Sequence, residues 1–258
     1  MQNLRFMQPL VIPLIILFAG IQQSFAQIAN IESKRMQTDS VRFVLKESLS
    51  GSFNSTNGDY IYQLRNSLAT QLKSKDLKKI YFLVSNYSLI RSANLDYWNT
   101  WFGHLRYNQQ ISELFRIEAF AQAEYNELLE VRRRNLLGGG LRFKLVDTDN
   151  IHVYLGNSYM YEIETAAEID YYNHRNSSYI SFSISSKDKK LELINTSYFQ
   201  PLYSDITDYK LLEQAKFDIK LSNKLSMFML YNYYLNSRTP SDIRQYISNG
   251  NIGISLHL

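Results

Sequence analysis

The sequence contains no cysteine, and only four of its 258 residues are proline. Without cysteine, the chain has neither a disulfide framework nor a thiolate metal site. Pro9 and Pro13 lie near the start, which leaves Pro201 and Pro240 for everything that follows. Proline cannot donate a backbone hydrogen bond to a sheet, so a chain of mostly paired strands is expected to exclude it.

The sequence also lacks a strong charge of one sign and a second long apolar run. Its formal net charge of +4 is too small to indicate a nucleic-acid partner. The one long apolar run, Leu10–Gly20, covers about 11 residues, whereas a transmembrane helix needs about 20. Arg5 precedes this run and Ser24-Phe25-Ala26 follows it, which predicts a secretory signal peptide cleaved between Ala26 and Gln27.

Aromatic residues are abundant at 14%, with 20 tyrosines, and polarity alternates along most of the chain. Phe115–Tyr125 shows the alternation clearly: its odd positions are apolar, whereas four of its five even positions are charged or polar. Successive side chains of a strand point to opposite faces, so this period of two predicts a strand with one apolar and one charged face.

Segments of this kind recur along the chain with turn-like breaks between them. We predict twelve strands, at residues 41–54, 60–73, 79–92, 98–110, 114–128, 135–147, 150–164, 177–187, 190–203, 209–222, 224–236 and 245–258. The breaks after even-numbered segments are tight, and those after odd-numbered segments are generally longer, such as Leu129–Arg134 and Thr165–Asn176. Short turns that alternate with long loops on an even number of antiparallel strands are typical of an outer-membrane barrel.

A secreted β-sandwich also alternates, so three further features are needed to separate it from a barrel. The predicted strands run to about 12–15 residues, whereas strands of globular proteins centre on about five or six. A leader is present, and aromatic residues cluster near the strand ends beside the longer loops, as an interfacial belt requires. They are Tyr60, Tyr62, Tyr97, Trp98, Trp101, Tyr125, Tyr161, Tyr203, Tyr233 and Tyr234.

These features predict an all-β protein, an antiparallel transmembrane β-barrel of about 12 strands with short periplasmic turns and longer extracellular loops. The predicted organisation is a signal peptide at residues 1–26, a periplasmic lead-in at 27–40 and the barrel at 41–258, in the outer membrane of a Gram-negative bacterium. The expected partners are outer-membrane lipid and lipopolysaccharide and the barrel-assembly machinery.

Three local motifs, together with the strand series, resemble the domain-of-unknown-function 481 family. They are Asn30-Ile31-Glu32-Ser33-Lys34-Arg35, the Gly-Ser-Phe-Asn-Ser-Thr-Asn-Gly stretch at 51–58, and Gly138-Gly139-Gly140. The resemblance covers about residues 28–258. It implies an outer-membrane barrel, in a family with some members associated with salt stress, and it carries no catalytic residues.

The polar faces of the predicted strands supply candidates for a lumen lining, in which positive residues outnumber acidic ones. The principal candidates are Arg65, His104, Arg106, Arg116, Glu118, Glu124, Arg142, Lys144, Lys216, Asp218 and Lys220, and Arg42, Lys46, His152 and Glu162 share these faces. A basic lumen favours small anionic solutes by focusing the electric field in a narrow tube. Alternatively, opposed charges such as Arg116, Glu118 and Glu124 pair into a plug that closes the barrel.

Other candidate chemistry is weaker. An outer-membrane lipid hydrolase is the catalytic alternative, but no serine stands in a recognisable motif beside a histidine, so no catalytic residue is assigned. No motif indicates a metal site or a cofactor. Gly138–Gly140 lies within a strand and is expected to allow curvature or to accommodate a bulky neighbour. Arg132–Arg134 is interpreted as a solvated charge run closing an extracellular loop.

Overall fold

A computed structural model of the chain describes residues 42–56, 59–92, 96–127, 131–166, 168–222, 225–239 and 246–256. The predicted signal peptide, its cleavage site at Ala26 and Gln27, and the lead-in at 27–40 lie outside the described residues. Across the described ranges, no helix is long and apolar enough to cross a membrane.

The described residues form one antiparallel sheet of twelve strands, which confirms the all-β prediction. Its strands are β1 (Phe43–Thr56), β2 (Asp59–Lys73), β3 (Lys79–Ser92), β4 (Asp96–Gln110), β5 (Phe115–Asn126), β6 (Val131–Asp147), β7 (Ile151–Ala166), β8 (Ile169–Ser185), β9 (Leu191–Pro201), β10 (Tyr209–Lys220), β11 (Leu225–Asn236) and β12 (Tyr246–Leu256). Each strand pairs with its neighbour in the sequence, so the topology is a simple meander.

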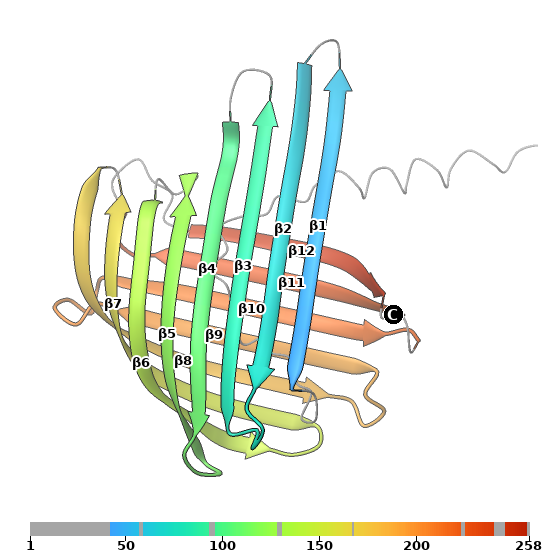
Figure 1. The fold of residues 1–258 in the computed structure, drawn as a ribbon, viewed down its shortest axis with the longest axis vertical. Helices are drawn as coiled ribbons and strands as arrows, with labels where there is room; N and C mark the ends of the chain where they lie inside the picture. The colour runs from blue at the N-terminus through green and yellow to red at the C-terminus, as the bar shows by residue number, and fades with distance from the viewer. Residues whose placement is uncertain are drawn as a thin grey trace, which may run out of the picture.

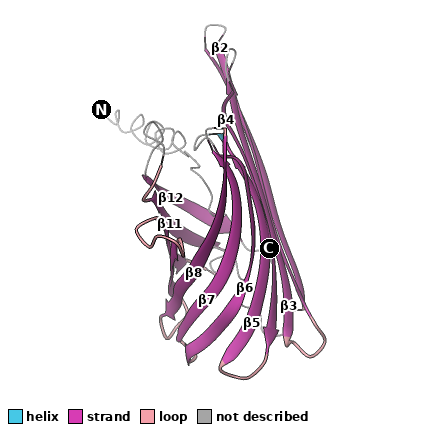
Figure 2. Cartoon of the chain, turned by 90° about the vertical axis from the view of Figure 1, so that its left-hand side faces the viewer, coloured by secondary structure: helices cyan, strands magenta, loops and turns pink. Residues whose placement is uncertain are grey.

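The sheet is strongly curled. Strands β1 to β5 run steeply in Figure 1, while β8 to β12 cross behind them. In the view turned by a quarter (Figure 2), β3 to β6 and β11 to β12 lie on opposite sides of the space that the sheet encloses. No ladder joins β1 to β12 within the residues described, so the sheet has two free edges and its closure into a barrel stays a prediction.

The strand positions agree with those predicted, but the loop lengths do not. β8 begins at Ile169 and β6 at Val131, so most of 165–176 and part of 129–134 belong to strands. Only residues 167–168 separate β7 from β8, and the predicted alternation of short turns with longer loops is wrong at this connection. The physical reason is pairing: Ile169 to Asn176 continue the ladder with β7 beyond the point where alternation fades.

The two ends of the sheet differ in their connections, and we call them the turn end and the loop end. The turn end carries the tight turns 74–78 and 186–190, which share the sequence Ser-Lys-Asp-x-Lys. In both turns the serine hydroxyl hydrogen-bonds the aspartate, and the next residue, Leu77 or Lys189, takes a positive φ of 59° or 55°. The loop end carries the two longest connections, residues 202–208 and 237–245.

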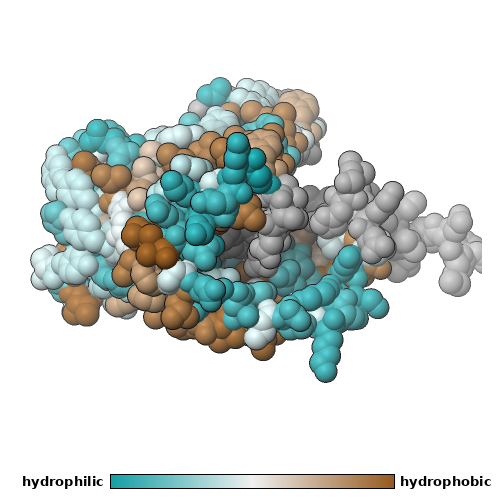
Figure 3. Space-filling view, turned by 60° about the horizontal axis from the view of Figure 1, so that its bottom comes forward, coloured by the Kyte–Doolittle hydropathy of each residue, from teal (hydrophilic) through white to brown (hydrophobic). Residues whose placement is uncertain are grey.

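The two faces of the sheet have opposite polarity. Leu105 and Leu137 on one face are 53% and 65% exposed, whereas Glu118 and Glu162 on the other are 2% and 0% exposed. Strand β5 follows this rule as predicted, with exposed Ile117 next to buried Glu118. We call the face with buried side chains the concave face, because contacts there join strands that are not neighbours. In Figure 3, turned so that the bottom of Figure 1 comes forward, apolar patches lie along the outer margin and hydrophilic side chains gather towards the centre.

The concave face also holds three small clusters of buried apolar side chains. The largest contains Tyr234, which is 9% exposed and does not belong to the outward aromatic belt predicted for it. Glycine makes room for such groups: a Cβ added at Gly138 would overlap the ring of Phe120, and one added at Gly156 would overlap Tyr179. The first of these confirms that the Gly138–Gly140 segment accommodates a bulky neighbour.

Candidate functional site

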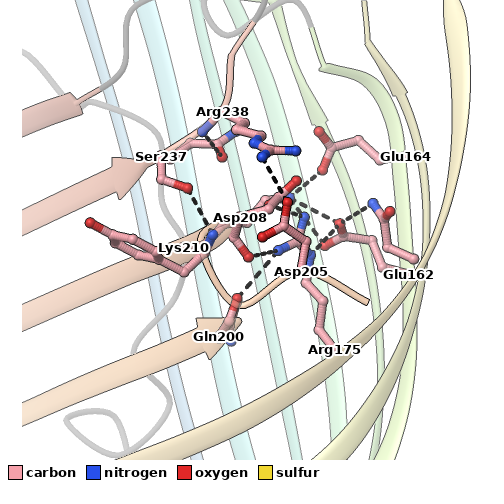
Figure 4. A network of polar contacts seen from close by, with 12 residues as sticks. Glu162, Glu164, Arg175, Gln200, Asp205, Asp208, Lys210, Ser237 and Arg238 are labelled. Carbon is pink, nitrogen blue, oxygen red and sulfur yellow. Dashed lines mark hydrogen bonds and ion pairs between the residues drawn. The ribbon is translucent and has the colours of Figure 1, made fainter. Parts of the chain in front are cut away.

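The concave face carries a dense network of buried charges near the loop end. This loop-end network consists of Glu124, Arg134, Glu162, Glu164, Arg175, Asp208 and Lys210, supplied by β5, β6, β7, β8, β10 and the loop before β10 (Figure 4). Alternation on each strand turns these side chains inward. The curl of the sheet then brings β7 and β10 within reach of each other, although two strands separate them in the sheet.

Glu162 is the centre of this network. Its carboxylate accepts hydrogen bonds from Arg134 Nη2 at 2.7 Å, from Arg175 Nε at 3.2 Å and from Lys210 Nζ at 3.0 Å. Asn173 Nδ2 donates a further bond at 3.1 Å. With the side chain of Glu162 fully buried, these partners replace the water that a carboxylate would otherwise require.

The other members of the network link Glu162 to the loop end. Lys210 reaches Glu164 at 2.6 Å, and Arg134 reaches Glu124 at 3.4 Å. Arg175 pairs with the carboxylate of Asp208 at 2.9 Å and donates to the backbone oxygen of Asp208 at 3.3 Å. Three cations thus face four carboxylates, so the charges in the network nearly cancel.

The loop 202–208 is held in place beside this network. Arg238 pairs with Asp205 at 2.7 Å, and Ser237 donates its hydroxyl to the backbone oxygen of Thr207 at 2.8 Å. Figure 4 shows Arg238 and Ser237 on one side of the loop and Arg175 on the other. Hydrogen bonds from Thr207, with smaller contributions from the charge and side chain of Arg238, hold the pKa of the Asp205 carboxyl below its ordinary value against the opposing effect of desolvation.

A second buried group surrounds Glu118 and lies nearer the turn end of the strands. Arg106 and Arg142 approach this carboxylate at 3.5 and 3.9 Å, and the Tyr179 hydroxyl donates to it at 3.0 Å. Tyr179 comes from β8 and Glu118 from β5, so this contact also spans the concave space. His104 lies between the rings of Phe102 and Phe120 and hydrogen-bonds Gln122 through Nδ1 at 3.0 Å.

A cavity of about 320 Å³ opens at the turn end, where β4 to β7 meet their turns. Its lining includes the cations Arg116, Arg142 and Lys144, and also Asp147 and His152. Asp147 accepts from Lys144 at 2.7 Å through one oxygen and contacts His152 Nδ1 at 2.7 Å through the other. We call this the turn-end cavity.

The structure brings together some of the predicted lumen residues and separates others. Arg106, Glu118 and Arg142 meet around one carboxylate, and Arg116, Arg142 and Lys144 share the turn-end cavity. Glu124 joins the loop-end network. Lys216 and Asp218 form a separate pair at 2.6 Å on β10, Lys220 is exposed at the end of that strand, and Arg65 is half-buried on β2. Lys46 lies among the residues whose side chains are not described.

Several members of the loop-end network are missing from the predicted lining. Arg134 was expected in a solvated loop, but it lies on β6 and its side chain is 3% exposed. Arg175 fell in a predicted loop that is part of β8. A usable signal existed for Arg134, because it shares its even numbering, and hence its face, with Arg142 and Lys144 on the same strand. The same holds for Glu164 beside Glu162, and for Lys210 beside Lys216.

Three of the four histidines lie within the described residues, and each contacts a polar side chain. His152 contacts Asp147, His104 contacts Gln122, and His174 Nδ1 lies 2.5 Å from the Tyr159 hydroxyl. These partners provide no serine nucleophile. Within the described ranges no group of three His, Cys, Asp or Glu residues is placed to hold a metal ion.

Two solved structures share the general shape of the chain. One is described as the NanC porin in a rhombohedral crystal form; it matches with a TM-score of 0.46 and 10% identity, over 84% of this chain and 100% of that one. The other is a bacterial polysaccharide outer-membrane secretin, with a TM-score of 0.43 and 9% identity, over 82% of this chain and 78% of that one. At these TM-scores neither likeness identifies a function.

Comparison with curated proteins gives no match. The family model described as "Protein of unknown function, DUF481" matches residues 46–246, which is most of the sequence and nearly all of the described sheet. The chain therefore belongs to the DUF481 family.

Proposed function

We propose that the chain forms a β-barrel in the outer membrane of a Gram-negative bacterium and passes small anionic solutes through a narrow polar interior. The observation that carries the proposal is the polarity of the two faces of the sheet, which is the reverse of that in a water-soluble protein. Apolar side chains such as Leu105, Leu137 and Ile180 are exposed on the outer face, while charged side chains are buried on the concave face. Exposed apolar surface on this scale is suited to lipid, not to water.

Closure of the sheet is the first requirement of the proposal. Strands that cross the hydrocarbon region need every backbone group paired, so β1 and β12 must join in the membrane. With twelve strands these two edges run antiparallel, and their ladder would match all the others. Strands of 11–17 residues reach or exceed the length of about 9–11 residues that a tilted membrane strand needs. The barrel-assembly machinery, outer-membrane lipid and lipopolysaccharide are the partners implied.

The proposed passage is narrow because side chains occupy part of the concave space. A barrel of twelve strands lies between the filled eight-stranded barrels and the open sixteen-stranded porins. The contacts from Lys210 to Glu162 and from Tyr179 to Glu118 each reach across two intervening strands of the wall. The loop-end network therefore forms a constriction on the β5 to β10 side.

The preference for anions rests on the turn end. Arg116, Arg142 and Lys144 line the cavity there with only two carboxylates, Glu113 and Asp147, among the lining residues. Excess positive charge in a cavity with low-dielectric walls raises the local concentration of anions. We propose no catalytic step and no cofactor.

A plugged barrel that acts through partner binding is the second candidate. The loop-end network favours it, because its three cations and four carboxylates satisfy one another and the loop 202–208 is held over them.

Two measurements test these proposals. Heat-modifiable gel migration tests the barrel: folded and boiled samples that migrate alike would contradict it. Single-channel recording of the refolded protein in planar bilayers tests the passage. We expect small conductance steps and a reversal potential that shifts towards the chloride equilibrium potential in a salt gradient. A folded, heat-modifiable protein without conductance steps at any salt concentration would replace the channel with the plugged barrel.

A further inference from the structure

Arg116 differs from the other buried or half-buried arginines of β4 to β8. Arg134, Arg175, Arg106 and Arg142 each have a carboxylate within 4 Å. The side chain of Arg116 instead donates from Nη2 to the neutral oxygen of Gln110 at 3.2 Å. Among the described residues it forms no ion pair, and its buried Nη1 atom has no hydrogen-bond partner. A guanidinium withdrawn from water without a counter-charge is unfavourable unless something else supplies one.

The surroundings of Arg116 have room for such a counter-charge. Arg116 lines the turn-end cavity, whose volume of about 320 Å³ is close to that of small-molecule sites. Lys144 is on the same wall, where its amino group already pairs with Asp147. Arg142 lies over the ring of Tyr154, with its guanidinium carbon 3.9 Å from the ring centre, and this contact restricts its movement.

The chemistry of this set selects the ligand class. Guanidinium groups bind the oxygens of carboxylates and phosphates in pairs, and a second cation nearby strengthens the contact. The carboxylates of the lining are already engaged or lie outside: Asp147 serves both Lys144 and His152, and Glu113 is exposed in the turn 111–114. Glu118, whose charge also acts on Arg116, is already held by Arg106 and Arg142, so none of these three carboxylates forms an ion pair with Arg116.

We propose that the turn-end cavity is a binding site for a small oxyanion, a free phosphate or carboxylate, with Arg116 as its principal ligand and Lys144 as its second. The site lies on the concave face among β4 to β7, which pair consecutively, so it does not require the outer edges of the sheet to meet. The role of this site rests on the proposed function, because an oxyanion bound at the turn end would lie at one opening of the proposed passage.

The experiment is calorimetric titration of the full, refolded protein in a zwitterionic detergent with inorganic phosphate. We expect saturable binding by the unmodified chain and a loss of about tenfold or more in affinity for Arg116→Gln. The matched control is Arg132→Gln, which removes the same charge from an exposed pair with Glu168 at the other end of β6. Its affinity for phosphate is expected to equal that of the unmodified chain.

Several outcomes would overturn the proposal. They are absence of phosphate and acetate binding by the folded chain, equal binding by Arg116→Gln, or equal losses in both variants. If Arg116→Gln fails the gel-shift assay for folding, Lys144→Gln serves in its place, with a smaller but measurable loss expected. Competition by an anionic lipid in mixed micelles would assign the cavity to a lipid headgroup and overturn the free solute. Phosphate binding without conductance would support the site and contradict the channel. Conductance without phosphate binding would support the channel and contradict the site.

Discussion

The two ends of the concave face use the same kinds of side chain to opposite effect. At the loop end, three cations and four carboxylates are buried together, and Glu162 contacts all three cations, Arg134, Arg175 and Lys210. At the turn end, three cations surround a cavity, and one of them, Arg116, has no carboxylate. Arg134 and Arg142 mark the two regions on one strand, eight residues or about 26 Å apart. Charges that pair with one another, as at the loop end, favour a rigid network. A charge without an ion-pair partner beside a cavity, as at the turn end, favours binding of an anion.

The largest effect on stability is expected from a substitution in the loop-end network. Replacing Glu162 with Gln leaves three buried cations without their shared carboxylate, so the free energy of unfolding should fall by about 3–5 kcal/mol. Urea unfolding in detergent, followed by gel migration, measures the change. Glu168→Gln is the control, because its pair with Arg132 is exposed and should contribute about 0.5 kcal/mol or less. Equal effects of the two substitutions would show that the loop-end network is not a stabilising unit.

A smaller effect is expected from the layer between the two ends. In Gly156→Ala the added methyl group overlaps the ring of Tyr179 and displaces its hydroxyl from Glu118. We expect a loss of about 1–3 kcal/mol, typical of overpacking, in the same unfolding assay. Gly250→Ala is the matched control, because no heavy atom lies within 4 Å of its added Cβ. A Gly156→Ala protein as stable as this control would mean that Tyr179 does not need its place over the glycine.

At the turn-end cavity, replacing one of the acidic lining residues is expected to raise the affinity for phosphate. Asp147→Asn releases Lys144, so phosphate should bind about threefold more tightly in calorimetric titration, equivalent to roughly 0.6 kcal/mol. Asp218→Asn makes the same chemical change on β10, where it releases Lys216 outside the cavity. Its phosphate affinity should not change, and an equal gain in both variants would indicate a general charge effect.

The smallest effect is expected for the loop 202–208, which lies beside the loop-end network. The pKa of Asp205 is lowered by hydrogen bonds from Thr207 and by Arg238, so its contacts contribute fully above about pH 4, near the ordinary pKa of aspartate. As the pH falls through the lowered pKa, the carboxylate is protonated and the contribution is lost. The amide resonance of Thr207, whose N–H donates to Asp205 at 3.0 Å, should report this titration below pH 4. Asp205→Asn should abolish it, and a titration above pH 5 would contradict the assignment.

Much of the strand layout could be predicted, whereas the main charged network could not. Alternation is a local property, so the all-β class and the alternating faces of β5 follow from residue order alone. Arg134 and Arg175 were missed because strand ends lie where alternation fades and pairing partners decide. The difference between Arg106 and Arg116 is likewise absent from the sequence, since both are arginines on inward faces. Only the fold shows that Glu118 lies within 4 Å of Arg106 and not of Arg116.

Residue order was enough to predict an apolar and a polar face along strands such as β5, because a period of two is built into extended backbone. It also showed that no disulfide holds the strands together, since the sequence contains no cysteine. The curl of the sheet decided the rest, since it brings β7 towards β10 and β5 towards β8 and thereby selects which charges meet. Coulombic attraction and hydrogen bonding act over a few ångströms in such a site, so charge balance at each end depends on that tertiary geometry.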